Sequence, residues 1–296
     1  MSPRRRRASA ATIFFALLSL ALGIALYWKI RSSGPSAPAP VPAAPTRAPS
    51  PRRAAPSPAA SPARPTPAPL PSPSASRQAR VAVIIDDLGN DHAAVMRLAG
   101  WPLPVAGAVL PGLAGSTSAD DALWRAGKDV LLHLPMEPRG SGPRPGPGVI
   151  LVSQTDAQIR ATLATDLASV PHAAGVNNHM GSAATADLRV MRVVAEELAR
   201  RGLYFVDSRT TVETVAAGAA AERHVPSASR RVFLDDVQTE PAVQQSLDTL
   251  VARAKAEGSA IAIGHPHPTT LAVLERELPR LGQRGVRLVR VAELVR

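Results

Sequence analysis

Short apolar runs recur along the chain from residue 81 onward, and nearly all of them end on side chains that can bind a metal or transfer a proton. Six runs and the polar residues that follow them are 81–85 with Asp86 and Asp87, 129–132 with His133, 175–176 with Asn177, Asn178 and His179, 203–206 with Asp207, 232–234 with Asp235 and Asp236, and 261–264 with His265 and His267. A seventh run, 104–110, ends on Pro111. Runs that are apolar throughout are typical of strands buried on both faces of a parallel sheet.

Helical periodicity alternates with these runs. Four segments repeat apolar residues every three or four positions, which predicts amphipathic helices over residues 155–170, 185–201, 240–257 and 269–282. Thr185 is expected to cap the second helix, Gly202 and Gly258 to end the second and third, and Pro279 to kink or end the fourth. Residues 286–291 are expected to form a last strand.

Seven or eight β/α units of this kind predict an α/β fold, and within that class a (β/α) barrel. The alternative is an open doubly wound sheet. No glycine-rich dinucleotide fingerprint or phosphate loop follows the first strand, so an open sheet that binds a nucleotide has little support. In a parallel barrel the carboxyl ends of the strands meet at one rim, so the polar residues that end the strands are expected to converge there.

The first eighty residues predict two further regions. Residues 4–7 are four arginines, and the apolar stretch 8–30 that follows is long enough to cross a bilayer as a helix. The arginines are expected to stay in the cytoplasm, so residues 1–31 are predicted to form an uncleaved anchor, with a cleaved signal peptide as the alternative. Residues 32–80 hold fifteen of the thirty prolines and are expected to form a disordered linker. The folded domain is then 81–296, held in a bacterial periplasm by a single-pass anchor in the inner membrane.

Charge is divided unevenly between these regions. Residues 1–80 carry twelve of the 34 basic side chains and no acidic ones, which leaves 22 basic and 23 acidic side chains in residues 81–296, a net charge of −1. Because the folded part is not basic and aromatic residues are few, no surface for nucleic acid is expected. The chain has no cysteine, so any metal must be bound by imidazole and carboxylate groups.

Three strand ends carry the residue types of a hydrolytic metal site. Asp86 and Asp87 follow the first strand, and because side chains alternate along a strand, one is expected to face the barrel axis and the other the rim. Such a pair can divide two tasks, one carboxylate binding a cation while the other takes a proton from bound water. A helix cap and a turn before Gly89 are the alternative. His133 and His179, at two further strand ends, are candidate ligands.

Other polar residues accompany these candidates. His265 and His267 are held between prolines, so one ring is a candidate general acid and the other a structural group. Candidates to bind substrate or to orient an imidazole are Glu137, Asn177, Asn178, Asp207, Asp235 and Asp236. Groups expected to lie on the surface are His92, His172 and His224. Residues 139–148, rich in proline and glycine, are expected to line a groove at the rim. No Gly-x-Ser-x-Gly motif supports serine-hydrolase chemistry.

Taken together, these motifs resemble the divergent polysaccharide deacetylase family. The matching segments are Ile85-Asp86-Asp87-Leu88-Gly89, His133-Leu134-Pro135-Met136-Glu137-Pro138, Gly175-Val176-Asn177-Asn178-His179-Met180-Gly181-Ser182, Phe205-Val206-Asp207-Ser208 and Ile263-Gly264-His265-Pro266-His267-Pro268. The resemblance extends over nearly all of residues 81–296. It implies a distorted (β/α) barrel and kinship with metal-dependent enzymes that remove acetyl groups from N-acetylated sugars.

The resemblance also implies roles for individual residues. Asp86 would be the general base, Asp87 a ligand of a divalent metal, for which zinc is expected, and His265 the general acid. Better-known relatives take their two histidine ligands from one His-x-x-x-His element, whereas this chain has His133-x-x-x-Glu137. His133 and His179 are therefore expected to be the remaining ligands, with Glu137 as the alternative ligand.

The function expected from this resemblance is metal-dependent deacetylation of a carbohydrate polymer similar to peptidoglycan, by a hydrolase that the N-terminal helix attaches to the membrane. The aromatic-rich substrate loop of the usual relatives is not recognisable in the sequence. The alternative is a non-catalytic module that keeps the barrel to bind a glycan or a protein of the cell envelope.

Overall fold

The computed structural model of the protein describes residues 78–142 and 144–296. The predicted anchor, residues 1–31, and the predicted linker up to residue 77 lie outside the described residues. Among the residues that are described, no helix is both long enough and apolar enough to cross a membrane.

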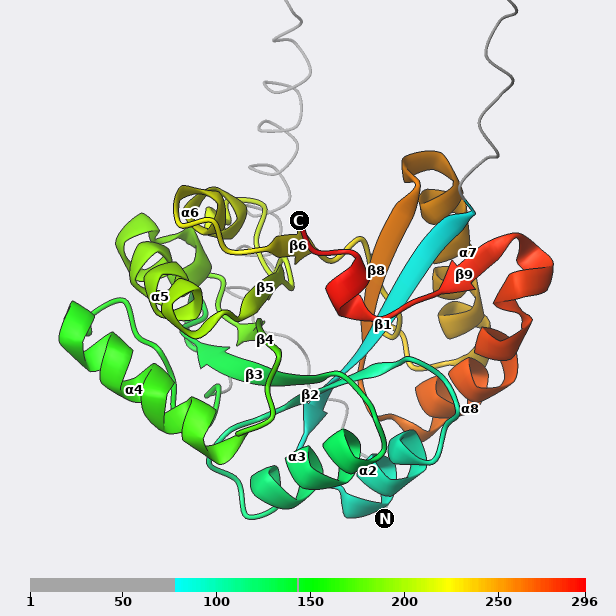
Figure 1. Ribbon diagram of the computed structural model, residues 1–296, viewed down its shortest axis with the longest axis horizontal. Helices are drawn as coiled ribbons and strands as arrows, with labels where there is room; N and C mark the ends of the chain where they lie inside the picture. The colour runs from blue at the N-terminus through cyan, green and yellow to red at the C-terminus, as the bar shows by residue number, and fades with distance from the viewer. Residues whose placement is uncertain (1–77, 143) are drawn as a thin grey trace, which may run out of the picture. The chain divides into compact units, whose positions relative to one another are not determined.

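Nine strands form one sheet in which every pairing is parallel (Figure 1). Their bounds are β1 Ala79–Leu88, β2 Ala106–Val109, β3 Val130–Met136, β4 Gly175–Met180, β5 Tyr204–Asp207, β6 Ser227–Ser229, β7 Val232–Phe233, β8 Ser259–Gly264 and β9 Val286–Leu288. Eight of them follow the order β6-β5-β4-β3-β2-β1-β8-β7, and β9 pairs with β1. Because β6 and β7 end this path without pairing with each other, the barrel is open between them. The predicted α/β distorted barrel is confirmed.

Helices cover the outside of the sheet (Figure 1). Their bounds are α2 His92–Ala99, α3 Ser116–Arg125, α4 Asp156–Ser169, α5 Leu188–Arg201, α6 Ala216–Glu222, α7 Glu240–Glu257 and α8 Pro268–Glu277. Short 3-10 turns are η1 Ala184–Ala186, η2 Leu278–Arg284 and η3 Val291–Glu293. The four helices predicted from periodicity are present as α4, α5, α7 and α8, and α8 ends just before Pro279, as expected. Gly202 and Gly258 end α5 and α7 in the left-handed conformation, also as expected.

One predicted cap is wrong. Thr185 does not cap α5, because the chain first makes the turn η1, in which the Thr185 hydroxyl donates a hydrogen bond to the Gly181 carbonyl. Asp187 is the cap instead, and its carboxylate accepts a hydrogen bond from the Val190 amide at 2.9 Å. The helix therefore begins three residues later than the sequence pattern indicates.

Two apolar layers hold the barrel together. The larger layer lies between the sheet and the helices and takes the outward-facing strand residues such as Val83 and Ile85. The smaller layer fills the inside of the barrel with residues such as Ile84, Leu131 and Ile263. Because side chains alternate along a strand, strands such as β1 and β3 contribute to both layers. The inward-facing positions matter most for function, because at the carboxyl ends of the strands their side chains lie at the rim of the barrel.

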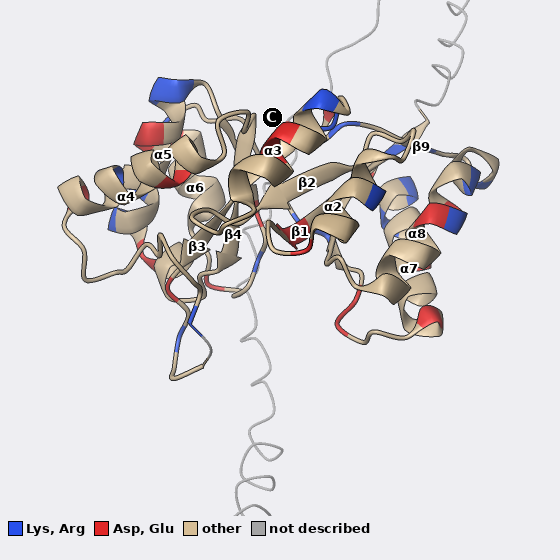
Figure 2. Cartoon of the chain, turned by 90° about the horizontal axis from the view of Figure 1, so that it is seen from below, with Lys and Arg blue, Asp and Glu red and all other residues tan. Residues whose placement is uncertain are grey.

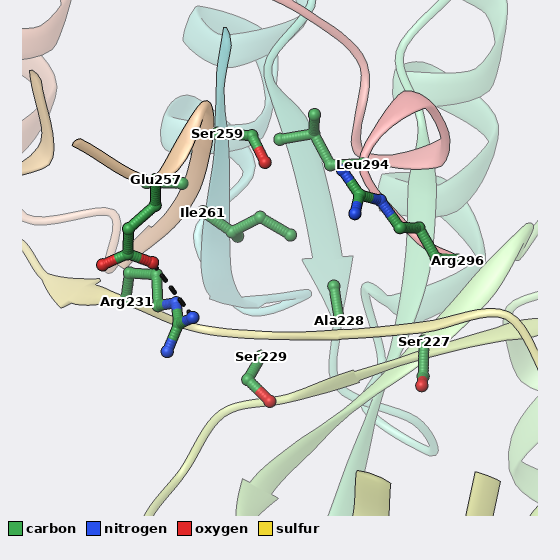
Figure 3. Close-up of a pocket in the computed structure, with 10 residues that line it drawn as sticks. Ser227, Ala228, Ser229, Arg231, Glu257, Ser259, Ile261, Leu294 and Arg296 are labelled. Atoms are coloured by element: carbon green, nitrogen blue, oxygen red, sulfur yellow. Dashed lines mark ion pairs between the residues drawn. The ribbon is translucent and has the colours of Figure 1, made fainter. Parts of the chain in front are cut away.

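The opening of the barrel holds a cavity next to β6 and the first residues of β8, at the end where the strands begin (Figure 3). It measures about 530 Å³ and is lined by serine hydroxyls and by an ion pair of 3.0 Å between Arg231 and Glu257. The backbone of Arg296 pairs with Ser227 of β6 at the edge of this cavity. None of the strand-end aspartates and histidines lines it, so volume alone does not locate the chemistry of this fold.

Charged side chains of both signs are mixed over the outer helices (Figure 2). Several form ion pairs between helices, such as Arg97 of α2 with Glu275 of α8 at 2.7 Å and Arg192 of α5 with Glu222 of α6 at 2.7 Å. Exposed pairs of this kind contribute little stability individually, about 0–1 kcal/mol each.

Candidate active site

Alternation along the strands decides which polar residues reach the rim of the barrel interior. Inward-facing Ala82 and Ile84 are followed two residues later by Asp86 on β1. The same two-residue step leads from Leu131 to His133 on β3. The other inward series ending on polar residues are Asn177 to His179 on β4, Val206 to Ser208 after β5, Phe233 to Asp235 after β7, and Ile263 to His265 after β8.

Three ligand atoms from β1, β3 and β4 converge at this rim. The Asp87 Oδ1 atom lies 3.2 Å from His133 Nε2 and 3.0 Å from His179 Nδ1, and the two imidazole nitrogens are 3.1 Å apart. For a tetrahedral zinc ion with bonds of about 2.0–2.1 Å, neighbouring ligand atoms are about 3.3 Å apart. The triad therefore has the spacing of a mononuclear metal site.

Asp87 reaches this triad through a distortion of its strand. Its φ angle is 57°, in the left-handed region, and the pairing of β1 with β2 shifts register between Ile85 and Leu88. Asp86 is buried and Asp87 lies at the rim, which is the expected division, but strict alternation does not produce it. The left-handed residue interrupts alternation, so Asp87 faces the same side of the strand as Asp86. Such a conformation costs on the order of 1–3 kcal/mol and is found most often at functional sites.

The donor set fits a divalent metal. Asp87 Oδ1 is buried and accepts no hydrogen bond from any described residue. Burial raises the pKa of the Asp87 carboxyl, but His133 and His179 outweigh burial and hold this pKa well below its usual range. One carboxylate and two imidazoles without cysteine are the ligands that zinc takes in hydrolytic enzymes. A carboxylate that stays ionised and faces two imidazole nitrogens has the arrangement that a shared cation requires.

Asn177 connects this triad to Asp86. Its side-chain oxygen lies 2.9 Å from His133 Nδ1, and its side-chain nitrogen donates to Asp86 Oδ1 at 2.8 Å. The pairing of β3 with β4 places His133 directly beside Asn177, so the contact follows from strand register. The other Asp86 oxygen lies 3.5 Å from His133 Nε2. Burial raises the pKa of Asp86 above its ordinary value, although His133 and Asn177 act in the opposite direction.

His265 faces the triad from β8. Its Nδ1 atom lies 3.0 Å from Asp235 Oδ1, and its Nε2 atom lies 3.8 Å from Asp87 Oδ2. The Asp235 carboxylate also accepts hydrogen bonds from the His265 amide and the Thr270 hydroxyl. Burial lowers the pKa of His265, but Asp235 outweighs burial and raises this pKa above its ordinary value. A protonated imidazole with its Nε2–H directed at the site is suited to general acid catalysis.

Comparison with known proteins agrees with this geometry. The family model for divergent polysaccharide deacetylases matches residues 83–295, which include all the site residues described above. The chain belongs to the divergent polysaccharide deacetylase family. The resemblance seen in the sequence is thereby confirmed.

Three proteins are similar to this deacetylase-family chain over about three quarters of its length. An uncharacterised protein of Haemophilus influenzae is 35% identical over 219 residues, which cover 74% of this chain and 78% of that protein. The uncharacterised protein YibQ of Escherichia coli is 34% identical over 216 residues, covering 73% of this chain and 67% of YibQ. The crystal structure of uncharacterised protein ATU2773 from Agrobacterium tumefaciens is 26% identical with a TM-score of 0.70, covering 76% of this chain and 92% of that chain.

Two sequence candidates lie away from the deacetylase-like triad. Asp207 does not orient an imidazole, because it faces outward on β5 and accepts hydrogen bonds from the Arg209 amide at 2.8 Å and the Thr214 hydroxyl at 3.0 Å. Asn178 also faces away from the triad and braces the backbone of Met180 and Ser208. Both residues therefore hold the shape of the rim loops.

Glu137 and His267 lie beside the site without joining the triad. The Glu137 carboxylate accepts a hydrogen bond from the Val152 amide at 2.6 Å, which closes the base of the loop 139–148. His267 lies next to His265, with ring centroids 5.7 Å apart, and its Nε2 atom is 2.9 Å from the Gln238 amide nitrogen. Ligand atoms of His267, His265 and Asp235 also lie close together, although Asp235 is already satisfied by three hydrogen bonds.

Asp235 is the residue that sequence reasoning underrated. The sequence pattern places it, together with Asp236, only among the candidates that bind substrate or orient an imidazole. Strand alternation could have identified it, because Asp235 lies two residues after inward-facing Phe233 and therefore faces inward, whereas Asp236 faces outward. Arg230 was overlooked, and its guanidinium covers the Phe233 ring at 4.6 Å. Ser208, which ends the matching segment Phe205-Val206-Asp207-Ser208, has its Oγ atom 3.4 Å from the Asn177 amide nitrogen.

The remaining histidines lie on the outside of the family fold. His92 and His224 are exposed, as predicted. His172 is half-buried, and the prediction that it is a plain surface group is wrong. Its Nδ1 atom lies 2.7 Å from Asp120 Oδ2, and its ring stacks on Trp124 with centroids 4.1 Å apart.

A cleft of about 310 Å³ gives access to the triad. Asp87 and His179 line this cleft together with Arg144, Pro145 and Pro147 of the loop 139–148. The expectation that this loop lines a groove at the rim is confirmed. The cleft is smaller than the cavity at the other end of the barrel, but it alone of these two contains strand-end carboxylates and imidazoles.

Proposed function

We propose that this chain is a metal-dependent hydrolase that removes acetyl groups from an N-acetylated polysaccharide, similar to peptidoglycan, in the bacterial envelope. The observation that carries the proposal is the convergence of Asp87, His133 and His179 beside two further groups, Asp86 and His265, next to a cleft that Asp87 and His179 line. Family membership supports the same reaction class. The arginine run and apolar stretch before residue 31 support a membrane anchor with this domain in the periplasm.

The proposed reaction divides among the chain's own residues. Asp87, His133 and His179 would hold a divalent ion, with zinc as the best match to the ligand set. When bound, such an ion supplies Lewis acidity, which polarises the acetamide carbonyl and lowers the pKa of water toward about 7. Asp86 takes the proton from the attacking water, and its raised pKa brings it closer to a working pH near neutrality.

Departure of the amine requires a second proton. The carbon–nitrogen bond of the acetamide breaks as His265 donates its Nε2 proton to the leaving nitrogen, and the products are acetate and a free amino sugar. Asp235 holds the His265 ring through Nδ1 and stabilises its protonated form. Water is therefore added across one amide bond, with no other reactant.

The proposal is tested by acetate release from an N-acetylglucosamine oligomer with the purified chain. Stripping with a chelator should abolish release, and zinc should restore it. Asp86→Asn and His265→Ala should each bind the oligomer but release acetate at least about 100-fold more slowly, which is the lower range for loss of general acid or base catalysis. If the wild-type chain binds peptidoglycan but releases no acetate with any divalent metal, the non-catalytic glycan-binding alternative replaces this proposal.

A further inference from the structure

Asn177 occupies a unique position among the described residues, because it contacts both the proposed metal triad and the proposed general base. Its side chain is completely buried on β4, with no accessible surface. The oxygen of the amide faces His133 Nδ1 at 2.9 Å, and the nitrogen faces Asp86 Oδ1 at 2.8 Å. No other side chain bridges these two residues in residues 78–142 and 144–296.

Hydrogen-bond chemistry fixes the direction of this chain of contacts. An ionised carboxylate only accepts hydrogen bonds, so the NH₂ group of Asn177 must face Asp86. The amide oxygen then faces His133, and because that oxygen only accepts, the proton of the neutral imidazole must be on Nδ1. The Nε2 atom of His133 is left with its lone pair, directed at Asp87 Oδ1 and His179 Nδ1.

We propose that Asn177 is a positioning residue that sets the tautomer of His133 for metal binding and at the same time orients the Asp86 carboxylate. The Asp86 part of this proposal rests on the proposed function, whereas the His133 part requires only that the triad binds a divalent metal. An imidazole ligand commonly needs a partner for its second nitrogen, and that partner is most often a carboxylate, a backbone carbonyl or water. Here a neutral amide takes this place.

A neutral amide suits this position for an electrostatic reason. Asp86 and Asp87 already place two carboxylates beside His133, at 3.5 Å and 3.2 Å from its Nε2 atom. A third carboxylate in place of Asn177 would add a like charge next to Asp86 in a buried site. The amide instead offers one acceptor and one donor on a rigid plane, so it satisfies both neighbours without adding charge.

Two substitutions separate the two contacts. Asn177→Asp keeps an acceptor for His133 Nδ1 but has no N–H for Asp86, whereas Asn177→Ala removes both contacts. The matched control is Asn178→Asp, which makes the same chemical change one residue along the strand on the opposite face, where the side chain touches only the backbone of Met180 and Ser208. Thermal unfolding of each purified chain establishes that it is folded.

Three readouts follow these contacts. The ¹⁵N chemical shifts of the His133 ring in the metal-free chain report its tautomer, competition with a chromophoric chelator reports zinc affinity, and crystal structures report the rotamer of Asp86. Acetate release from the N-acetylglucosamine oligomer is the fourth readout. Only this last measurement depends on the proposed function.

Asn177→Ala should give mixed His133 tautomers, a zinc affinity that is about 10–100-fold weaker, and a displaced Asp86 carboxylate. Asn177→Asp should keep the Nδ1–H tautomer and an undiminished zinc affinity, while Asp86 turns away and acetate release falls at least about tenfold. Asn178→Asp should leave the His133 tautomer and the zinc affinity unchanged.

The proposal is overturned if Asn177→Ala leaves the His133 tautomer and the zinc affinity as in the wild type, or if Asn177→Asp leaves the Asp86 rotamer unmoved. It is also overturned if Asn178→Asp reproduces the losses of Asn177→Ala, because the effect would then be general loosening of β4. If the wild type binds zinc but releases no acetate, the proposed function fails, and the tautomer, affinity and rotamer still decide the role of Asn177.

Discussion

Asp87 and Asp166 each bury a carboxylate oxygen that accepts no hydrogen bond from the described residues, yet their surroundings are opposite. The Asp87 oxygen faces two imidazole nitrogens at 3.2 and 3.0 Å, and these rings hold its pKa low despite burial. Asp166, on α4, packs against Gly148, and burial with no compensating partner raises its pKa to about 7. An unsatisfied buried oxygen therefore indicates a cation site only where other ligands converge on it.

The largest expected effect separates these two carboxylates directly. Asp87→Asn removes the only anionic ligand of the triad, so zinc affinity should fall by more than the roughly 10–100-fold caused by changes behind a ligand. Acetate release should fall to background. Zinc competition and acetate assays on the purified variant measure both, with Asp166→Asn as the control that should retain wild-type zinc affinity. Equal zinc affinity in the two variants would erase the distinction drawn between these aspartates.

A smaller effect is expected at His265, whose Nδ1 atom is already paired with the Asp235 carboxylate. Asp235 raises the pKa of His265 against the opposing effect of burial. A general acid works only while protonated, so activity persists up to this raised pKa and declines at higher pH. Asp235→Asn removes the main cause of the increase and should move the alkaline limb of the kcat/KM profile to lower pH.

The control for this pH shift is Asp236→Asn. Asp236 is the exposed neighbour of opposite strand parity, and it makes no contact with His265 among the hydrogen bonds and ion pairs of the described residues. Its replacement should leave the alkaline limb in place. An unmoved limb in Asp235→Asn would mean that His265 does not supply the proton, whereas a shift in both variants would indicate a long-range charge effect.

Asp166 is expected to affect how the free energy of unfolding depends on pH, without affecting acetate release. Its folded-state pKa of about 7 lies above the unfolded value of 3.8, so the folded chain takes up a proton as pH falls and becomes more stable from about pH 7 down to about pH 4. Asp166→Asn should remove this dependence. At pH 8 the variant should be more stable than the wild type, by up to about 4 kcal/mol at 1.36 kcal/mol per pKa unit.

Urea unfolding of wild type and Asp166→Asn at pH 5 and pH 8 measures this difference. The two chains should be closer in unfolding free energy at pH 5 than at pH 8. If the wild type is as stable as the variant at pH 8, the ionised Asp166 carboxylate must have a stabilising partner. The comparison of Asp166 with Asp87 would then fail.

The smallest effect is expected at the other end of the barrel. Arg231 forms an exposed ion pair with Glu257 at the 530 Å³ cavity, far from the strand ends that carry the carboxylates. Arg231→Ala should cost less than about 1 kcal/mol of unfolding free energy and leave acetate release unchanged. Loss of acetate release in this variant would connect the cavity to the chemistry and contradict the assignment of function to the smaller cleft.

Much of this fold could be predicted because its signals are local. Apolar runs identified every strand except β6, and helical periodicity identified the helices α4, α5, α7 and α8. The strand β6 was missed because Ser227-Ala228-Ser229 is short and polar, and its strand geometry comes from pairing with β5. The helices α2, α3 and α6 span only seven to ten residues and were not identified. The helix α8 is equally short, but its series of leucines continues through η2.

The site could be predicted as a set of strand ends but not as a set of contacts. Strict alternation places Asp86, His133, Asn177 and Asp235 inward and Asp207 outward, and the structure agrees with this parity. Asp87 violates it, because a left-handed residue and a register shift turn its side chain inward. A sequence contains no local signal for such an irregularity, since Asp adopts many backbone conformations and the shift depends on the neighbouring strand.

The central claim is that Asp87, His133 and His179 together bind one divalent metal ion. Anomalous diffraction at the zinc edge, from crystals of the chain grown with zinc, tests it most directly. The account predicts one strong peak about 2.0–2.2 Å from a carboxylate oxygen of Asp87, from His133 Nε2 and from His179 Nδ1. A zinc-loaded crystal with no peak between these three side chains, or with the ion bound elsewhere, would contradict it.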